Sequence, residues 1–400
     1  AEDSIAMALR ILDGSTAQRR DGEGSLSGFL GSFSTLALMG FVAMWSASSG
    51  YGIRMNQGAS HFALRQAIFF VPAIIVFFLS SRIPLEKLRT LIGPLTLISL
   101  ISLLLPFIPG LGIEINGARR WINLGITNFQ PSELWKPVVL VYTAHIMAKK
   151  GELIRRSAWE AVFPLLVLSF GTAIIYLQDD FSTSMLALLA GISLFWIAGV
   201  PLRFFLGVFI LLVPAAILMI TSSEYRLIRV LGYIIPDYDP HGMNYQVQNS
   251  IRAIMSGEFW GKGLGLGTRK LGSIPEVQSD FVFAAFAEET GLLGVAAVFA
   301  VWTFLVYSVV REARKKDAFP QYLALGMLAL LSIQFLVNIG VVSGFLPATG
   351  IALPFFSAGG SSLMSTALAG GVIFNALRTR GFEALAPGEE ELITGGNDNE

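Results

Sequence analysis

The sequence predicts an all-α polytopic integral membrane protein with about ten transmembrane helices and both termini in the cytoplasm. Composition, the spacing of long apolar runs and the distribution of basic residues lead to this prediction. Of the 400 residues, 54% are hydrophobic and only 14% are charged, whereas a soluble domain carries about 25% charged residues. So few charges cannot cover such an apolar chain with a water-facing surface, and much of that surface must face lipid.

Long apolar runs give the number of spans. A membrane-crossing helix needs about 20 mostly apolar residues. The fourth run is the most polar, because Glu133 and Lys136 lie in its first turn. Runs of this kind lie near residues 26–48, 62–80, 90–108, 132–148, 158–177, 183–200, 204–221, 282–310, 320–342 and 355–377.

Basic residues give the orientation. With the N-terminus inside, they fall in every second connection, as the positive-inside rule requires. An even number of spans then returns the C-terminus to the cytoplasm. The clusters are Arg82, Lys87 and Arg89; Lys149, Lys150, Arg155 and Arg156; Arg203; Arg311, Arg314, Lys315 and Lys316; and Arg378 and Arg380.

The chain is predicted to be one membrane domain, residues 26–380, between two tails. Residues 1–25 are charged and lack the apolar core and cleavage site of a secretory signal, so we expect a cytoplasmic tail. Residues 381–400 are acidic and Gly-rich, which is typical of disorder. The outer loop 222–281 is long enough to hold chemistry and contains an amphipathic stretch, Val247 to Met255, that suits the bilayer surface.

Composition also excludes some functions. The chain has no cysteine, which excludes disulfides, zinc–thiolate sites and a cysteine nucleophile. Its formal net charge is zero, so nothing indicates a nucleic-acid partner.

Charged residues at the membrane border are functional candidates, because burying charge in a bilayer is costly. Arg119, Arg120 and Trp121, in GARRWINLG, combine two guanidiniums with an indole. This arrangement suits an anionic headgroup, since arginine binds phosphate through paired N–H groups. An interfacial anchor, a tryptophan with snorkelling arginines, is the other interpretation.

The segment FQPSELWKP has the pattern of a helix start at Pro131. Glu133 then lies in the first turn, near the positive end of the helix dipole. Lys136 follows three residues later, so the two side chains can pair on one face. The pair either neutralises itself as a structural feature or contacts a substrate.

Two adjacent carboxylates, Asp179 and Asp180, lie in QDDFST. They either bind a divalent cation or cap the helix that follows, and two adjacent carboxylates favour capping over a metal site. The three histidines form no ligand pattern. A divalent cation is therefore the only cofactor that the sequence suggests.

Asp280 is the strongest catalytic candidate. It lies where the long outer loop re-enters the membrane, in PEVQSDFVFAAFAEETGLLG. Partial desolvation there favours proton uptake by the carboxylate, as a general base requires. Glu288 and Glu289 lie deeper, and we expect them to be structural, paired with Lys136 or with helix ends.

Two further features belong to the outer side. Lys262 and its basic neighbours make the loop positive, which suits an anionic lipid headgroup. The segment 346–362, LPATGIALPFFSAGGSS, breaks the approach to the last span. A broken backbone at membrane depth must line a cavity or be buried in protein, and Ser361 and Ser362 supply hydroxyls there.

Four of these segments occur together in one known family. GARRWINLG, FQPSEL, PEVQSDFVFAAFAEETGLLG and LPATGIALPFFSAGGSS resemble, in order and spacing, the hallmark segments of the SEDS proteins FtsW, RodA and SpoVE. The resemblance covers roughly residues 26–380. The charged N-terminal tail and YRLIRVLGYIIPDYDPHGMNYQ followed by GLGLGTRKL favour the FtsW branch.

The resemblance implies a peptidoglycan glycosyltransferase that polymerises lipid II on the outer face of the bacterial cytoplasmic membrane, for septal or elongation wall synthesis. An acceptor hydroxyl would attack the anomeric carbon, and undecaprenyl diphosphate would leave with inversion. Asp280 matches the catalytic aspartate of the family's TDF motif. Cationic groups such as Arg119, Arg120 and Lys136 would stabilise the departing diphosphate. Implied partners are a class B penicillin-binding protein and other divisome or elongasome proteins.

Two other functions remain: a lipid II flippase, or a scaffold for a penicillin-binding protein. A flippase needs a polar path through the membrane, whereas the non-cytoplasmic charges here cluster on the outer side, which favours surface chemistry. The chain also departs from the family pattern at Gln278-Ser279, where His-Thr is usual, and at Asp179 and Ala358. Any role of that histidine is therefore excluded.

Overall fold

The computed structural model describes residues 24–48, 58, 60–115, 117–125, 127–235, 243–268 and 279–379. The two predicted tails lie almost wholly outside this part of the chain. Its longer helices are Gly24–Ser48, α2 (His61–Arg82), α3 (Leu85–Ser102), α4 (Pro131–Lys150), α6 (Val162–Leu177), α7 (Phe181–Ile197), α8 (Leu202–Thr221), α9 (Glu224–Ile234), α10 (Met243–Gly257), α11 (Val282–Ala313), α12 (Ala318–Val342) and α13 (Gly360–Arg378). Short helices are η1 (Leu105–Phe107), α5 (Glu152–Arg156) and η2 (Ala158–Ala161).

The all-α membrane class is confirmed. Among the described residues, eight helices are long and apolar enough to cross a bilayer. α7 is shorter, at 17 residues, and α4 is more polar because Glu133, Lys136 and two terminal lysines lie on it. All ten predicted runs fall on helices, while the count of ten crossings and the side of the termini stay predictions.

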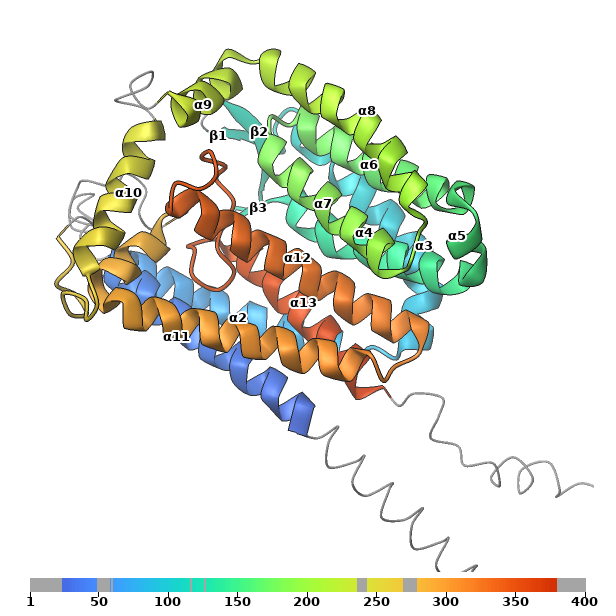
Figure 1. Cartoon of the computed structure of the whole chain (residues 1–400), viewed down its shortest axis with the longest axis horizontal. Coiled ribbons are helices and arrows are strands. Elements are labelled where there is room, and N and C mark those ends of the chain that lie inside the picture. The colour runs from blue at the N-terminus through green and yellow to red at the C-terminus, as the bar shows by residue number, and fades with distance from the viewer. Residues whose placement is uncertain are drawn as a thin grey trace, which may run out of the picture.

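The bundle has a centre and a periphery. The share of the apolar stretch buried inside the protein is 72% for α13 and 61% for α12, but only 6% for α8. α8 therefore turns nearly all its surface outward, as a lipid-facing helix does. The start of helix Gly24–Ser48 and the end of α13 lie at one end of the bundle, and the strands, α9 and the α12–α13 connection lie at the other (Figure 1).

The outer segment that precedes α4 folds as a small antiparallel sheet of β1 (Gly112–Ile115), β2 (Ala118–Asn123) and β3 (Asn128–Phe129), in that order. Ile113 lies opposite Trp121, and Ile122 lies opposite Phe129. The sequence analysis did not predict these strands. The sheet satisfies backbone polar groups at the bundle end and leads directly into Gln130, the N-cap of α4.

The amphipathic stretch predicted in the outer loop is α10, and it packs on the bundle rather than lying alone on the bilayer. Val247 is buried, and Ser250 Oγ donates to the carbonyl of Val342 at 2.6 Å. Met255 remains 71% exposed on the opposite side.

α11 is broken at Gly291, whose φ of 63° and ψ of −163° lie outside the helical region. The loop 258–263 supplies the missing hydrogen bonds. The N–H groups of Leu292 and Leu293 donate to the carbonyls of Glu258 and Phe259, and those of Lys262 and Gly263 donate to the carbonyls of Glu288 and Glu289. The loop thus pairs with the helix break, so the freed backbone groups stay satisfied at membrane depth.

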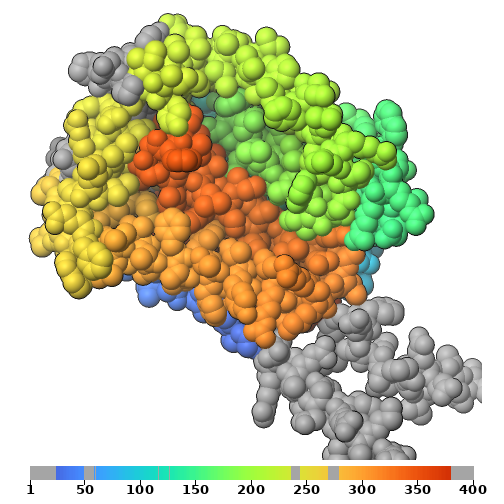
Figure 2. All heavy atoms as spheres, viewed as in Figure 1, coloured from blue at the N-terminus to red at the C-terminus, as the bar shows by residue number. Residues whose placement is uncertain are grey.

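The second half of the connection between α12 and α13, residues 351–357, is mostly buried in protein, which is one of the two situations that the sequence analysis expects of a broken backbone. Leu353, Phe355 and Phe356 are at most 4% exposed. Ser357 closes a turn, because its Oγ accepts from the N–H of Leu353 at 2.7 Å. Figure 2 shows the connection, in orange-red, between α10 (yellow) and the green helices.

Replacing Gly291 by alanine should destabilise the protein strongly. A Cβ there would lie 2.3 Å from the N of Gly261 and 2.7 Å from the carbonyl O of Phe259, at a positive φ. We expect the free energy of unfolding to fall by about 3 kcal/mol, from strain of this kind, measured by thermal unfolding in detergent. Gly207→Ala on α8 is the control, because no atom lies within 4 Å of its Cβ position. Equal midpoints for the two variants would contradict the role of the break.

Candidate functional site

The first turn of α4 carries a buried ion pair. Pro131 occupies the first helical position, where its missing N–H is no loss. Lys136 Nζ lies 2.8 Å from Glu133 Oε1, and the side chains are 2% and 9% exposed. The predicted pairing is therefore confirmed. Glu133 Oε2 is buried without a hydrogen-bond partner among the described residues, so the carboxylate retains accepting capacity.

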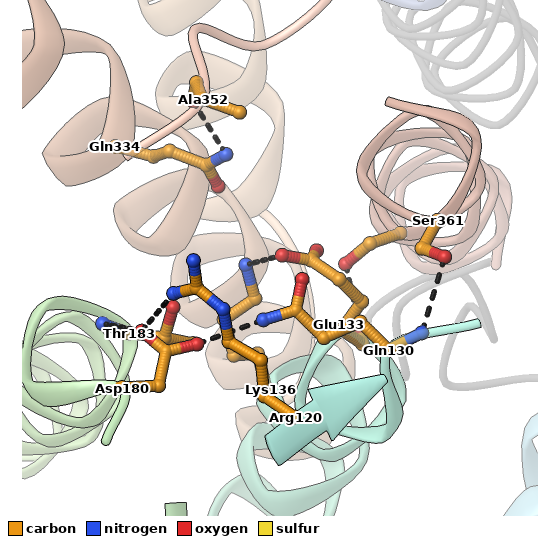
Figure 3. A network of polar contacts seen from close by, with 10 residues as sticks. Arg120, Gln130, Glu133, Lys136, Asp180, Thr183, Gln334, Ala352 and Ser361 are labelled. Carbon is orange, nitrogen blue, oxygen red and sulfur yellow. Dashed lines mark hydrogen bonds and ion pairs between the residues drawn. The ribbon is translucent and has the colours of Figure 1, made fainter. Parts of the chain in front are cut away.

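Asp180 joins three elements at this point. Its Oδ1 accepts from the N–H of Thr183 at 3.2 Å and lies 3.4 Å from Arg120 Nη1. Its Oδ2 accepts from Gln130 Nε2 at 2.8 Å. Asp180 caps α7, as predicted, and also ties α7 to β2 and to the start of α4 (Figure 3).

α13 closes the other side of the α4 N-terminus. Ser361 Oγ accepts from the N–H of Gln130 at 3.3 Å, and Ser365 Oγ donates to the carbonyl of Glu133 at 2.8 Å. Ser361 thus contacts the residue before α4, and its role in substrate binding stays a prediction. Ser362 is half-buried next to it and takes no part in the contacts between the described residues of this network.

Asp280 lies two residues before Val282, the first residue of α11, and is half-buried. Its Oδ1 accepts from Ser279 Oγ at 3.0 Å. Its Oδ2 lies 3.5 Å from the position that a Cβ on Gly350 would occupy. The carboxylate therefore lies against Gly350 of the α12–α13 connection, at the end of the bundle that the sequence analysis assigns to the outer side.

Arg229, on α9, is a site residue that the sequence analysis missed. It lies within electrostatic range of both Asp280 and Arg120, which links the two halves of the site. Burial lowers the pKa of Arg229, and the nearby Tyr225 and Asp280 oppose that shift. Its guanidinium stacks over Tyr225 at 4.3 Å. The four-residue spacing of Tyr225 and Arg229 in YRLIRV is the signal that marks this helix face.

α9 is attached at both ends. Arg226 lies over the ring of Tyr176, 4.8 Å from its centre, which ties α9 to the end of α6. Tyr233 OH donates to the carbonyl of Phe345 at 2.9 Å, which ties it to the α12–α13 connection. The helix therefore bridges the outer end of the bundle.

Lys262 lies in a second polar cluster at the break in α11. Its Nζ is 2.6 Å from Glu288 Oε1, and Glu288 is 0% exposed. Glu288 also accepts from the N–H and Oγ1 of Thr268. The sequence analysis considered Lys136 or helix ends as partners of Glu288. In the structure Lys136 pairs with Glu133, and the loop brings Lys262 to Glu288. A carboxylate buried this deeply is stable only with such partners.

Arg119 and Trp121 lie on β2, beside Arg120 but outside its network. Arg119 Nε pairs with Glu114 Oε2 at 2.9 Å, with both side chains more than half exposed. Trp121 is half-buried. Alternation along the strand explains the difference, because neighbouring side chains point to opposite faces.

The described residues contain no group of three or more His, Asp or Glu side chains that could hold a metal ion. The carboxylate oxygens of Asp180 instead contact nitrogen donors of Gln130, Thr183 and Arg120. The chemistry that this arrangement supports is proton transfer at Asp280 beside cations that can bind an anion.

Comparison with known proteins shows which family has these motifs. The sequence profile of the cell cycle protein family of FtsW, RodA and SpoVE matches residues 28–381. A probable peptidoglycan glycosyltransferase FtsW from Idiomarina loihiensis is 36% identical over 342 residues, covering 84% of this chain and 83% of the relative. One from Geobacter metallireducens is 36% identical over 341 residues, covering 85% and 91%.

Two solved structures of peptidoglycan synthesis and cell shape proteins have the same fold as this chain. A chain of a peptidoglycan synthase complex that coordinates polymerisation and crosslinking superposes with a TM-score of 0.71 at 28% identity, covering 88% of this chain and 97% of that one. The rod shape determining protein RodA of Thermus thermophilus gives 0.65 at 25% identity, covering 88% and 96%.

Glu133→Gln should destabilise the protein, because it leaves the Lys136 ammonium buried without its counter-charge. We expect a loss of about 3–5 kcal/mol in the free energy of unfolding, as for other broken buried pairs. The double variant Glu133→Gln/Lys136→Met removes both charges and should recover most of the stability. Thermal unfolding of the three proteins in one detergent measures this. A double variant as unstable as the single one would contradict the ion-pair interpretation.

Proposed function

The chain belongs to the cell cycle protein family of FtsW, RodA and SpoVE, and on this premise we propose that it polymerises lipid II with Asp280 as the general base. It is a peptidoglycan glycosyltransferase, the activity named for its relatives. One observation carries the assignment of Asp280. This carboxylate is half-buried at the entrance of α11, against Gly350 of the α12–α13 connection and within electrostatic range of Arg229.

The proposed step is a single displacement. The acceptor sugar hydroxyl gives its proton to Asp280 while its oxygen attacks the anomeric carbon of the donor. The bond from that carbon to the diphosphate oxygen breaks, and undecaprenyl diphosphate leaves with both bonding electrons. One displacement inverts the anomeric configuration. A carboxylate that is partly shielded from water is suited to take up the proton.

Cationic side chains would stabilise the leaving diphosphate. Arg120 is best placed, because its guanidinium is partly exposed while Asp180 fixes one edge, and its buried Nε has no hydrogen-bond partner among the described residues. Charge that develops on the diphosphate strengthens such contacts in the transition state. Lys136 would act through its pair with Glu133, and Ser361 fixes the turn that carries them. Arg119, Trp121, Lys262 and Ser362 remain predicted substrate contacts.

Membrane placement follows from charge and hydropathy. The chain is a multi-pass membrane protein. We assign it to the bacterial cytoplasmic membrane with the site on the outer face, since the basic connections fall at the opposite ends of the helices. A class B penicillin-binding protein is the proposed partner, which is supported by the likeness to a chain from a complex that couples polymerisation to crosslinking. Other divisome or elongasome membrane proteins are proposed on the family resemblance alone.

A flippase and a scaffold make different demands on Asp280. A flippase moves lipid II between leaflets and leaves it unpolymerised, and a scaffold tolerates loss of the carboxylate. Both are tested by the same substitution.

Asp280→Asn should abolish polymer formation, because the amide cannot accept the acceptor's proton. Labelled lipid II is incubated with the purified full chain and its candidate penicillin-binding partner, and products are resolved by gel electrophoresis. We expect at least a 100-fold loss of rate, as general-base catalysis is worth about 10²–10⁴-fold. The thermal midpoint of the variant should match that of the wild type.

Asp179→Asn is the matched control, since Asp179 is exposed at a positive φ that asparagine tolerates. It should retain wild-type polymer. Equal polymer from Asp280→Asn would exclude Asp280 as the base. No polymer from any protein, with lipid II transfer between leaflets of vesicles, would favour the flippase.

The charge-neutral variant Glu133→Gln/Lys136→Met should be folded yet form less than a tenth of the wild-type polymer. Because both charges are removed together, the variant should stay stable. A loss of polymer would then reflect a lost substrate contact rather than lost packing. Polymer assays on thermally matched samples measure the effect. Wild-type polymer from this variant would assign the pair a structural role only.

A further inference from the structure

Asn338 joins two chain segments that meet at the site. It lies in the last turns of α12 and is 1% exposed. Its Nδ2 donates to the carbonyl of Asp280 at 3.0 Å and to the carbonyl of Ile351 at 2.8 Å. One side-chain amide therefore uses both of its N–H groups to connect the entrance of α11 with the α12–α13 connection.

The assignment of the amide follows from its neighbours. Both contacted atoms are carbonyl oxygens, which only accept, so the NH₂ group must face them. Asn338 Oδ1 is buried without a hydrogen-bond partner among the described residues. The orientation of the side chain is thus fixed by its two donated bonds.

The same two segments meet again through the Asp280 carboxylate. Gly350 has a φ of +75°, and a Cβ there would lie 3.5 Å from Asp280 Oδ2. The residue next to Gly350 is Ile351, whose carbonyl Asn338 binds. The carbonyl that Asn338 binds and the Gly350 position that the Asp280 carboxylate approaches therefore belong to adjacent residues. The hydrogen bonds of Asn338 thus fix the distance between Gly350 and the Asp280 carboxylate.

Gln334, one helical turn earlier on the same face of α12, makes a related contact without reaching Asp280. Its Nε2 donates to the carbonyl of Ala352 at 2.8 Å, and it is 4% exposed. Figure 3 shows this bond beside the Arg120 and Lys136 network. Gln334 and Asn338 are both buried amides that donate to the α12–α13 connection. They differ in that Asn338 also donates to the carbonyl of Asp280.

We propose that Asn338 is a positioning residue for Asp280, whose backbone it ties to the α12–α13 connection so that the carboxylate is placed for proton transfer. The proposal rests on the proposed role of Asp280 as general base. Asn338 itself touches neither substrate nor the reacting atoms. Its loss should therefore lower kcat, the turnover rate of the enzyme–substrate complex, because a base that is displaced by about 1 Å loses much of its effect. The affinity for lipid II should stay unchanged.

Four variants of the full chain, assayed with its partner, test this. Asn338→Asp keeps the shape of the side chain and removes the NH₂ donor, Asn338→Leu removes all polar atoms, and Gln334→Leu is the control. We expect kcat to fall at least tenfold in both Asn338 variants with KM for lipid II within twofold. Gln334→Leu should keep at least half of the wild-type kcat, and Asn338→Gln, which retains the donor, should recover part of it.

Hydrogen–deuterium exchange gives a readout that does not depend on activity. In Asn338→Leu, peptides covering residues 279–285 and 346–353 should both exchange faster, whereas in Gln334→Leu only the second should. Wild-type kcat in Asn338→Asp, a raised KM with unchanged kcat, or unchanged exchange over 279–285 would each overturn the proposal. If the wild type forms no polymer, the proposed function fails, and the exchange at 279–285 alone decides whether Asn338 positions Asp280.

Discussion

The arrangement of the outer half of this protein depends on one constraint: a charge or a backbone polar group removed from water must find its partner within the protein. Glu288, Lys136 and Asp180 are each at most 2% exposed, and each is met by an opposite charge or by several donors. The same constraint explains the break in α11, where a loop supplies the bonds that the helix gives up. Without these partners the buried charges would destabilise the bundle rather than organise it.

Because most of these partners come from different elements, the site exists only when the bundle has closed. Asp180 joins the start of α7 to Gln130 before α4, and Ser361 and Ser365 of α13 join the same turn from the other side. α12 then connects the turn-rich segment 343–359 to the entrance of α11. Segments that lie far apart along the chain thereby meet at one end of the bundle.

Sequence alone was sufficient where partners are local. The Glu133–Lys136 pair is three residues apart, Asp180 caps the helix that follows it, and the prolines and glycines of 346–362 mark a break. It was insufficient where a loop sets the geometry. Lys262 lies 26 residues from Glu288, so no periodicity links them, and the sequence analysis considered Lys136 or helix ends instead. The small sheet, helix α9 with Arg229 and the kink at Gly291 were missed for a related reason. Each is short, and each depends on tertiary hydrogen bonds or packing rather than on a hydrophobic period.

A surface that binds a ligand differs from one that only stabilises the fold, because it keeps polar atoms without a partner in the protein. Buried polar groups in folded proteins are nearly always hydrogen-bonded, yet in the described part of the chain Arg120 Nε and Arg229 Nε are among the buried atoms that have no hydrogen-bond partner. Arg229 lies within electrostatic range of both Arg120 and Asp280. These two arginines lie on β2 and α9, at the end of the bundle to which the α12–α13 connection also belongs (Figure 1). Guanidinium N–H groups without a partner in the protein fit a surface that completes its hydrogen bonds with a bound sugar diphosphate. The ion pairs already fixed by the fold hold the rest of the site in place when the diphosphate binds.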